Sequence, residues 1–207
     1  MQFESLIFDI DGTLWDNRSV VAEGYNAQLK DEGMEHLSVN EDILSTVFGR
    51  VLRDIADILF VSVPETERYA LLDRCIARED ELLHSSDKLV SYPYVKETLE
   101  ELKKNHRLFI VSNSQVGYPE LSMEKMKLTH LISGHLCFGD THTCKGETII
   151  RLMKEHNITS ACYIGDTLGD QEAAELAGIP FIHCTFGFGT STNCFKAINS
   201  FSELLEI

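Results

Sequence analysis

The sequence lacks the features that mark several classes of protein. No apolar run approaches the roughly 18–20 residues of a membrane-spanning helix. No basic segment opens the chain, and Asp9 and Asp11 interrupt the first apolar stretch, so we do not expect a secretory signal peptide. Basic residues are few, because 18 Lys and Arg stand against 33 Asp and Glu, giving a net charge of −15. This balance argues against sequence-independent nucleic-acid binding, which depends on Lys and Arg.

The six cysteines include no close pair with the spacing of zinc ligands. A chain of 207 residues, 43% of them hydrophobic, is long enough to bury a core without metal or disulfide bonds. We therefore expect reduced thiols in a cytoplasmic protein. The sequence also lacks a long exposed heptad repeat or apolar patch, so a monomer is the default expectation.

Short apolar runs are the main secondary-structure signal, and such runs fit strands that are buried on both faces of a parallel sheet. They occupy residues 5–9, 107–111, 161–165 and 179–183, with a weaker candidate at 131–138. Helical patterns lie between them, at residues 95–102, 146–156 and 168–177. This alternation predicts an α/β fold with a doubly wound, Rossmann-like parallel sheet.

The segment 16–86 breaks this alternation and has helical patterns throughout. We expect helices near residues 20–32, 40–46, 51–60 and 65–83. We therefore predict a helical insert at 16–86, placed within an α/β core formed by residues 1–15 and 87–207.

Two carboxylates follow the first predicted strand, in Asp9-Ile10-Asp11-Gly12-Thr13. In an extended stretch Asp9 and Asp11 would point the same way, because side chains alternate in a strand. Ligands of open α/β sheets bind beyond the carboxyl ends of the strands. The two carboxylates and the Thr13 hydroxyl are therefore candidates for one site.

A second acidic pair, Asp166 and Asp170, follows another buried run at the start of a helix. Together with Asp9 and Asp11 it would form an oxygen-rich site for a hard cation, and Mg²⁺ suits carboxylates combined with phosphate oxygens. Ser112 ends the next predicted strand, and Lys145 precedes a helix. A hydroxyl, a cation and a helix start are suited to binding a phosphoryl group.

Four short motifs thus occur in order along the chain: Asp9-x-Asp11-Gly-Thr, Ser112, Lys145 and Gly165-Asp166-x3-Asp170. They resemble the motifs of the haloacid dehalogenase-like superfamily. The intervals between successive anchors, 103, 33 and 21 residues, are similar to those of members with a helical cap after the first motif. The segment 173–180 and the Gly187-Phe188-Gly189 motif look like the phosphoglycolate phosphatase-like branch. The resemblance covers nearly the whole chain but is weak in the cap.

The resemblance implies a hydrolase, specifically a Mg²⁺-dependent phosphatase acting on a small phosphomonoester. Asp9 resembles the nucleophile that forms an aspartyl-phosphate, and Asp11 resembles the general acid and base. Mg²⁺ would be held by the Asp9 carboxylate, the Asp11 carbonyl and Asp166, with Asp170 acting indirectly or through water. Ser112 and Lys145 would bind the transferring phosphoryl group.

Substrate choice in this family lies largely in the cap, where Gly49-Arg50 begins a predicted helix. We expect Arg50 to reach an anionic substrate group, and Asn113 is a further candidate for substrate binding.

A phosphosugar mutase is the main alternative, because that branch shares the motifs and the cap. A non-catalytic binding protein is less favoured, since Asp9, Asp11, Lys145 and Asp166 are all present. The sequence does not identify the physiological substrate.

Overall fold

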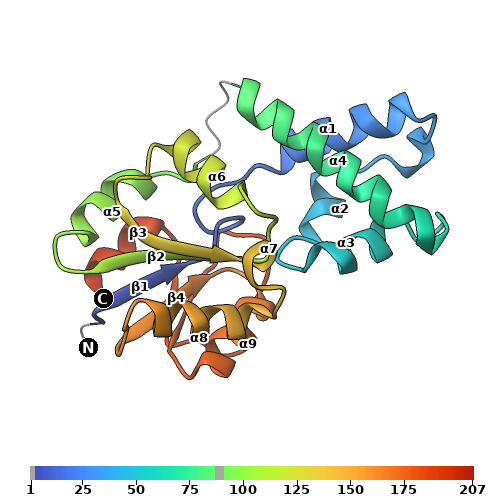
Figure 1. Cartoon of the computed structure of the whole chain (residues 1–207). Helices are drawn as coiled ribbons and strands as arrows, with labels where there is room; N and C mark the ends of the chain where they lie inside the picture. The colour runs from blue at the N-terminus through green and yellow to red at the C-terminus, as the bar shows by residue number, and fades with distance from the viewer. Residues whose placement is uncertain (1–2, 87–90) are drawn as a thin grey trace. The chain divides into compact units, whose positions relative to one another are not determined.

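The computed structural model describes residues 3–86 and 91–207. Six strands of this described part form one parallel sheet in the order β3-β2-β1-β4-β5-β6. The strands are β1 (Ser5–Phe8), β2 (Arg107–Ser112), β3 (Ile132–Cys137), β4 (Ala161–Gly165), β5 (Phe181–Cys184) and β6 (Lys196–Ile198). The predicted doubly wound parallel sheet is confirmed (Figure 1).

The apolar runs form the centre of this sheet because both of their faces are covered. Every residue of β1 and β4 is buried. On one face, Ile7 and Tyr163 pack in a cluster with Ile149 and Ala174, which come from helices α8 (Lys145–Glu155) and α9 (Leu168–Ala177). Phe8, whose side chain points to the opposite face, stacks on Phe201 at a ring-centroid distance of 5.8 Å.

The remaining helices of this unit connect or flank the strands. They are α5 (Val95–Leu102), α6 (Tyr118–Met126), α7 (Phe138–Thr141) and the 3₁₀ helix η2 (Phe201–Glu206). Sequence reasoning missed α6, α7, η2 and β6. For α6 a signal was available, because Gly117 and Pro119 flank its first residue, and proline is favoured in the first turn of a helix.

Residues Asn17–Lys88 form a second compact unit, separate from the unit formed by Met1–Asp16 and Leu89–Ile207. Its helices are α1 (Arg18–Asp31), η1 (Glu35–Leu37), α2 (Glu41–Ser45), α3 (Leu52–Leu59) and α4 (Glu65–Ser85). They share an apolar cluster of their own, which includes Leu29, Leu44 and Phe60. The predicted boundary between residues 86 and 87 adjoins residues 87–90, which lie outside the described residues. The assignment of this unit as a substrate-selecting cap stays a prediction.

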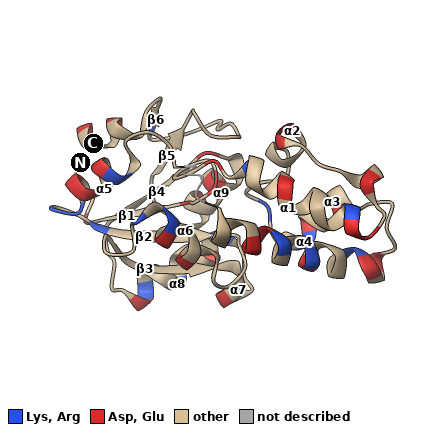
Figure 2. Ribbon diagram, turned by 90° about the horizontal axis from the view of Figure 1, so that it is seen from above, with Lys and Arg blue, Asp and Glu red and all other residues tan. Residues whose placement is uncertain are grey.

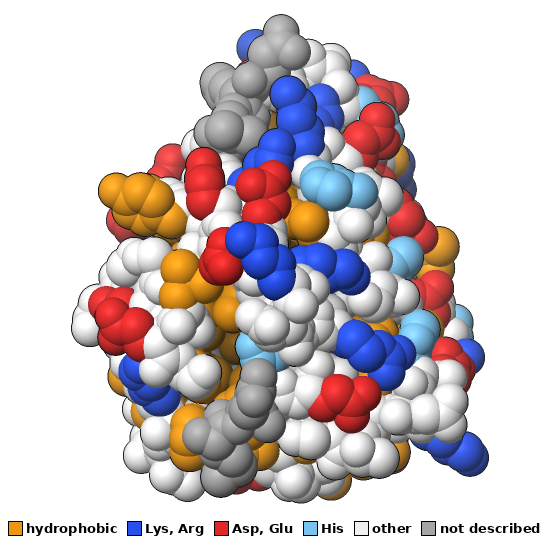
Figure 3. All heavy atoms as spheres, turned by 90° about the vertical axis from the view of Figure 1, so that its left-hand side faces the viewer, with side chains coloured by type: hydrophobic (Ala, Val, Ile, Leu, Met, Phe, Trp, Pro, Cys, Tyr) orange, Lys and Arg blue, Asp and Glu red, His pale blue; other side chains and the backbone are white. Residues whose placement is uncertain are grey.

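Charged residues of both signs are interspersed along the helices of each unit (Figure 2). Figure 3 shows the face on the left-hand side of Figure 1, where Lys and Arg lie among Asp, Glu and His. Among the ion pairs of the first strand's unit, Arg107 pairs with Glu4 at 3.5 Å. All six cysteines are free. Within the described residues, every helix is too short or too polar to span a membrane.

Candidate active site

The candidate site lies at the carboxyl ends of the central strands. Asp9 directly follows β1, Asp166 directly follows β4, and Ser112 is the last residue of β2. The chain runs outward from β1 through β2 and β3, and then returns to place β4 on the other side of β1. Such a reversal leaves a crevice at the strand ends, which is where open α/β sheets bind ligands.

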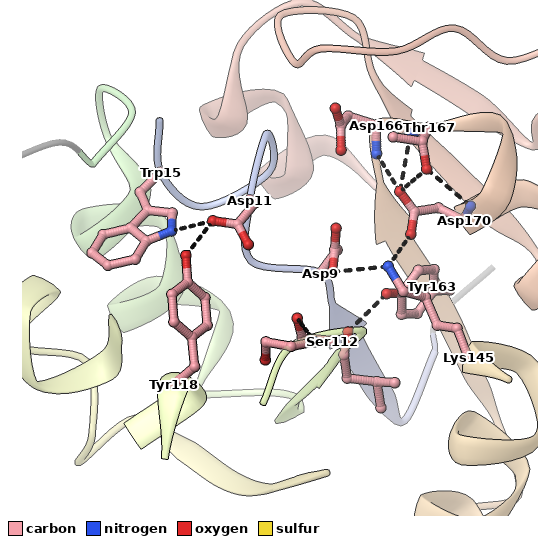
Figure 4. A network of polar contacts seen from close by, with 12 residues as sticks. Asp9, Asp11, Trp15, Ser112, Tyr118, Lys145, Tyr163, Asp166, Thr167 and Asp170 are labelled. Atoms are coloured by element: carbon pink, nitrogen blue, oxygen red, sulfur yellow. Dashed lines mark hydrogen bonds and ion pairs between the residues drawn. The ribbon is translucent and has the colours of Figure 1, made fainter. Parts of the chain in front are cut away.

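A buried lysine links two of the carboxylates. Lys145 is the first residue of α8, and its Nζ donates to Asp9 Oδ1 at 3.0 Å and to Asp170 Oδ1 at 2.6 Å (Figure 4). The three side chains are each at most 4% exposed. The helix start thus brings a cation against the Asp9 carboxylate, 136 residues away in sequence.

Asp170 has no oxygen left unoccupied. Its Oδ2 accepts from the amides of Asp166 and Thr167, at 3.1 and 2.9 Å, and from the Thr167 hydroxyl at 2.7 Å. Thr167 and Asp170 form the capping box that starts α9. Lys145 donates to the other oxygen, Oδ1, so both oxygens of Asp170 already accept hydrogen bonds. Asp170 is therefore better suited to act on a metal indirectly than to coordinate it.

Asp166 is held through one oxygen only. Its Oδ2 accepts from the amide of Phe188 at 2.6 Å and from that of Gly189 at 3.3 Å. Its Oδ1 is buried, and no group in the described part of the chain hydrogen-bonds to it. The Gly187 backbone packs so closely that an added Cβ would lie 2.5 Å from Asp166 Oδ2. The loop therefore fixes the orientation of Asp166 and leaves Oδ1 available.

The site holds more carboxyl groups than amino groups. Burial raises the pKa of Asp9 well above its usual value, against the opposing effect of Lys145. Burial, followed by the Asp170 charge, raises the pKa of Asp166 to about 7. Burial also acts to raise the pKa of Asp170, but the charge and hydrogen bonds of Lys145 outweigh it and lower that pKa. Three carboxylates with a single ammonium are suited to a further cation.

One oxygen from each of Asp9, Asp166 and Asp170 lies within 4.8 Å of the others. An all-oxygen donor set suits a hard cation such as Mg²⁺. The available Asp166 oxygen adds an acceptor to which no group among residues 3–86 and 91–207 donates. The residues present therefore fit Mg²⁺, with Asp9 and Asp166 better disposed as direct ligands than Asp170.

Asp11 lies apart from this cluster, beside two aromatic rings. Its Oδ1 accepts from Trp15 Nε1 at 2.8 Å and from the Tyr118 hydroxyl at 2.6 Å (Figure 4). Burial raises the pKa of Asp11 to about 6, and these two hydrogen bonds oppose the rise. The strand β1 ends at Phe8, a bend follows at Ile10, and Asp11 forms an isolated bridge with Trp15 across a turn at residues 12–14.

Sequence reasoning identified neither Tyr118 nor Trp15 as a hydrogen-bond partner of Asp11. No motif signals the Tyr118 contact, because Tyr118 lies 107 residues from Asp11. Trp15 lies only four residues from Asp11.

The other predicted site residues are Ser112, Thr13, Asn113 and Arg50. Ser112 is buried, and its Oγ accepts from the Ser114 amide at 3.2 Å. Thr13 is fully buried in the turn after Asp11, and Asn113 follows β2. Arg50 belongs to the second unit, where its Nε donates to the Thr46 carbonyl at 3.4 Å. Substrate binding by Thr13, Asn113 and Arg50 stays a prediction.

Comparisons with known proteins bear on the family of this chain. A family model described as haloacid dehalogenase-like hydrolase matches residues 6–184. A phosphoglycolate phosphatase of Aliivibrio fischeri is 29% identical over 88% of this chain and 84% of its own length. An N-acetylmuramic acid 6-phosphate phosphatase of Pseudomonas putida is 25% identical over 91% of this chain and 85% of its own length.

Solved structures show the same fold. A predicted phosphoglycolate phosphatase from Haemophilus somnus superimposes with a TM-score of 0.86 at 22% identity, covering 100% of this chain and 98% of that one. A haloacid dehalogenase-like family hydrolase from Streptococcus pneumoniae superimposes with a TM-score of 0.85 at 19% identity. The match covers 99% of this chain and 97% of that one. At these identities the likeness concerns the fold alone.

Proposed function

We propose that this chain, which belongs to the haloacid dehalogenase-like hydrolase family, is a phosphatase that hydrolyses small phosphomonoesters through a phosphorylated Asp9. One observation carries the proposal. The buried Asp9 carboxylate, at the end of the central strand, is paired with Lys145 beside an Asp166 oxygen that the described residues leave unsatisfied. The relatives with matching sequences include phosphatases by name, which supports the same class of reaction.

In the first step, an Asp9 carboxylate oxygen attacks phosphorus and forms an acyl phosphate. The bond between phosphorus and the ester oxygen breaks, and its electron pair stays with that oxygen. Asp11, in its neutral form, transfers its proton there and so releases the alcohol. Lys145 and Ser112 hydrogen-bond to the oxygens of the phosphoryl group during the transfer.

In the second step, Asp11 is a carboxylate and takes a proton from water. The resulting hydroxide oxygen bonds to phosphorus, and the bond between phosphorus and Asp9 breaks. Inorganic phosphate leaves, Asp9 returns to a carboxylate, and Asp11 is neutral again. One water molecule and one phosphomonoester thus yield one alcohol and one phosphate.

Asp9, Asp166 and the Asp11 carbonyl would hold Mg²⁺, which when bound offsets the charge repulsion between the Asp9 carboxylate and the phosphate. Asp170 acts indirectly, by holding Lys145 against Asp9. A net charge of −15 does not attract a phosphorylated substrate over long distances. Local charges at the site therefore do most of the binding.

The substrate class we propose is a small phosphorylated metabolite with a second anionic group, recognised by Arg50. Arg50→Ala should raise KM for such an ester and leave that for p-nitrophenyl phosphate unchanged. Arg53→Ala serves as a matched control, since Arg53 hydrogen-bonds to Tyr69 and pairs with Glu65 within the second unit. Equal KM values for Arg50→Ala and the unmodified enzyme would remove Arg50 from the proposal.

The test of the function is phosphate release from a panel of phosphomonoesters, with Mg²⁺ and with EDTA. We expect release that requires Mg²⁺ and is lost in Asp9→Asn, which is nearly isosteric but a poor nucleophile. Asp73→Asn, an exposed position on α4, should keep full activity. Absence of release from every ester would overturn the proposal and favour assays for a bisphosphate-primed sugar-phosphate mutase.

A further inference from the structure

Two aromatic side chains, Trp15 and Tyr118, hydrogen-bond to the Asp11 carboxylate of the candidate site. We propose that Tyr118 and Trp15 are positioning residues that determine which Asp11 oxygen exchanges the proton in the reaction. The inference rests on the proposed function, since it concerns the proton that Asp11 gives to the leaving group. It adds two residues that lie outside the four motifs.

The two donors converge on a single oxygen. The Tyr118 hydroxyl lies 2.6 Å and Trp15 Nε1 2.8 Å from the same Asp11 Oδ1. Figure 4 shows the second Asp11 oxygen on the side of the carboxyl group away from both rings. Indole N–H is only a donor, so Oδ1 must act as the acceptor in that bond.

This pattern fixes the position of the proton when Asp11 is neutral. A protonated carboxyl group has one O–H oxygen and one carbonyl oxygen, and the carbonyl oxygen is the better acceptor of two hydrogen bonds. Two donors at Oδ1 therefore place the proton on Oδ2. Without them, rotation about the last side-chain bond would exchange the two oxygens, because that torsion is broad and roughly two-fold.

The donors themselves are held firmly. Trp15 and Tyr118 are 1% and 4% exposed, and their rings meet edge to face at a centroid distance of 5.9 Å. The Trp15 carbonyl accepts from the Gly12 amide at 2.9 Å, and Trp15 pairs with Ser91 in an isolated bridge. Tyr118 begins α6. Two rings locked by packing orient a carboxyl group with little loss of conformational entropy during the reaction.

The test compares two leaving groups. An alkyl phosphomonoester needs a proton on its leaving oxygen, whereas p-nitrophenolate departs without one. The constant kcat/KM reports the first step, in which only the alkyl ester depends on Asp11 as an acid. We expect Tyr118→Phe to lower kcat/KM for the alkyl ester about 10–100-fold, the range for misplaced acid catalysts. For p-nitrophenyl phosphate we expect a change of about twofold at most, because no proton is transferred.

Trp15→Phe removes the second donor, keeps an aromatic ring, and should show the same selective loss. Tyr69→Phe is the matched control, because it also removes a hydroxyl bonded to a carboxylate, that of Asp57 at 3.0 Å in the second unit. It should leave both esters unaffected. In an Asp11→Asn background, Tyr118→Phe should add no further selective loss, because it acts through Asp11.

Equal losses with both esters, or no loss with either, in Tyr118→Phe and Trp15→Phe would overturn this inference and leave the proposed function standing. Absence of turnover of both esters by the unmodified enzyme would instead overturn the proposed function, and this inference with it. Selective loss in the two variants, with the control unchanged, would establish the positioning role.

Discussion

At the residue scale, each carboxylate of the site is distinguished by the donors that hold it. Both oxygens of Asp170 are occupied, one oxygen of Asp166 is occupied by backbone amides, and one oxygen of Asp11 is occupied by two rings. The three carboxylates therefore differ in which of their oxygens accept hydrogen bonds from the protein. The different roles proposed for these residues follow from their hydrogen-bond donors and from the charge of Lys145.

The Gly187 position provides a test of how Asp166 is oriented. In Gly187→Ala the new Cβ would lie 2.3 Å from Asp166 Cβ and 2.5 Å from the Gly12 carbonyl oxygen, so the loop and Asp166 must move. We expect Mg²⁺ affinity to fall about 10–100-fold, the usual effect of losing groups that orient a metal ligand. Isothermal titration calorimetry measures this change without substrate.

The matched control for that variant is Gly169→Ala, because the nearest atom to its added Cβ is 3.6 Å away. We expect unchanged Mg²⁺ affinity in the control. An unchanged affinity in Gly187→Ala as well would show that the loop does not orient Asp166.

At the element scale, the starts of two helices meet the ends of the strands. Lys145 is the first residue of α8, and the capping box of Thr167 and Asp170 begins α9. Helix starts favour anions because their backbone N–H groups point outward. In the second unit, an ion pair between side chains connects two helices. Arg74 of α4 donates two hydrogen bonds to Glu32 at the end of α1, at 2.6 and 2.7 Å.

The pair of Glu32 and Arg74 predicts a pH-dependent contribution to stability. Hydrogen bonding from Arg74 lowers the pKa of Glu32 to about 2, against an ordinary value of 4.5. The contribution is therefore present above pH 4.5 and is lost as the pH falls towards 2. We expect Arg74→Met to reduce the free energy of unfolding by about 1 kcal/mol at pH 7, since both side chains are partly exposed.

Urea denaturation followed by circular dichroism between pH 7 and pH 3 measures this contribution. The difference between the unmodified protein and Arg74→Met should stay constant from pH 7 to about pH 4.5 and then shrink towards pH 3. Arg78→Met is the control, because Arg78 has longer ion-pair distances, 3.2 and 3.6 Å, to exposed carboxylates. A difference that stays constant with pH would contradict the prediction.

At the scale of the whole molecule, each unit has its own apolar cluster. Leu44 and Phe60 belong to the cluster of the second unit, whereas Ile7 and Tyr163 belong to that of the first. Separate cores predict that the units lose structure separately, since the burial of apolar surface is the main source of stability.

Leu44→Ala tests this separation. Leu44 is fully buried in α2, and truncation of a buried leucine reduces the free energy of unfolding by about 2–5 kcal/mol. We expect the helical signal to show an early transition in urea, while the fluorescence of Trp15, the single tryptophan and part of the first unit, keeps its midpoint. Ile43→Ala, at an exposed position of the same helix, should change neither probe appreciably. Parallel shifts of both probes in Leu44→Ala would contradict separate unfolding.

Sequence patterns alone determined the class of the fold and the location of the candidate site. Buried parallel strands read as continuous apolar runs, and α9 was predicted at the bounds that the structure has, because Gly178 ends it in the left-handed conformation. Asp9, Asp166 and Ser112 were identified because parallel strands bring their carboxyl ends to one edge of a sheet. Local pattern and general topology were sufficient for these predictions.

Only the tertiary structure decided how the site residues are held. The contact between Tyr118 and Asp11 joins positions 107 residues apart, and the contact between Phe188 and Asp166 joins positions 22 apart. The three-residue strand β6 likewise depends on pairing with β5. Such contacts leave no periodic signal, because a hydrogen bond between distant segments depends on where the fold places both partners. The sequence by itself therefore predicted that Asp9, Asp166 and Asp170 would come together, and the tertiary structure determined which oxygens of these carboxylates are occupied by hydrogen-bond donors.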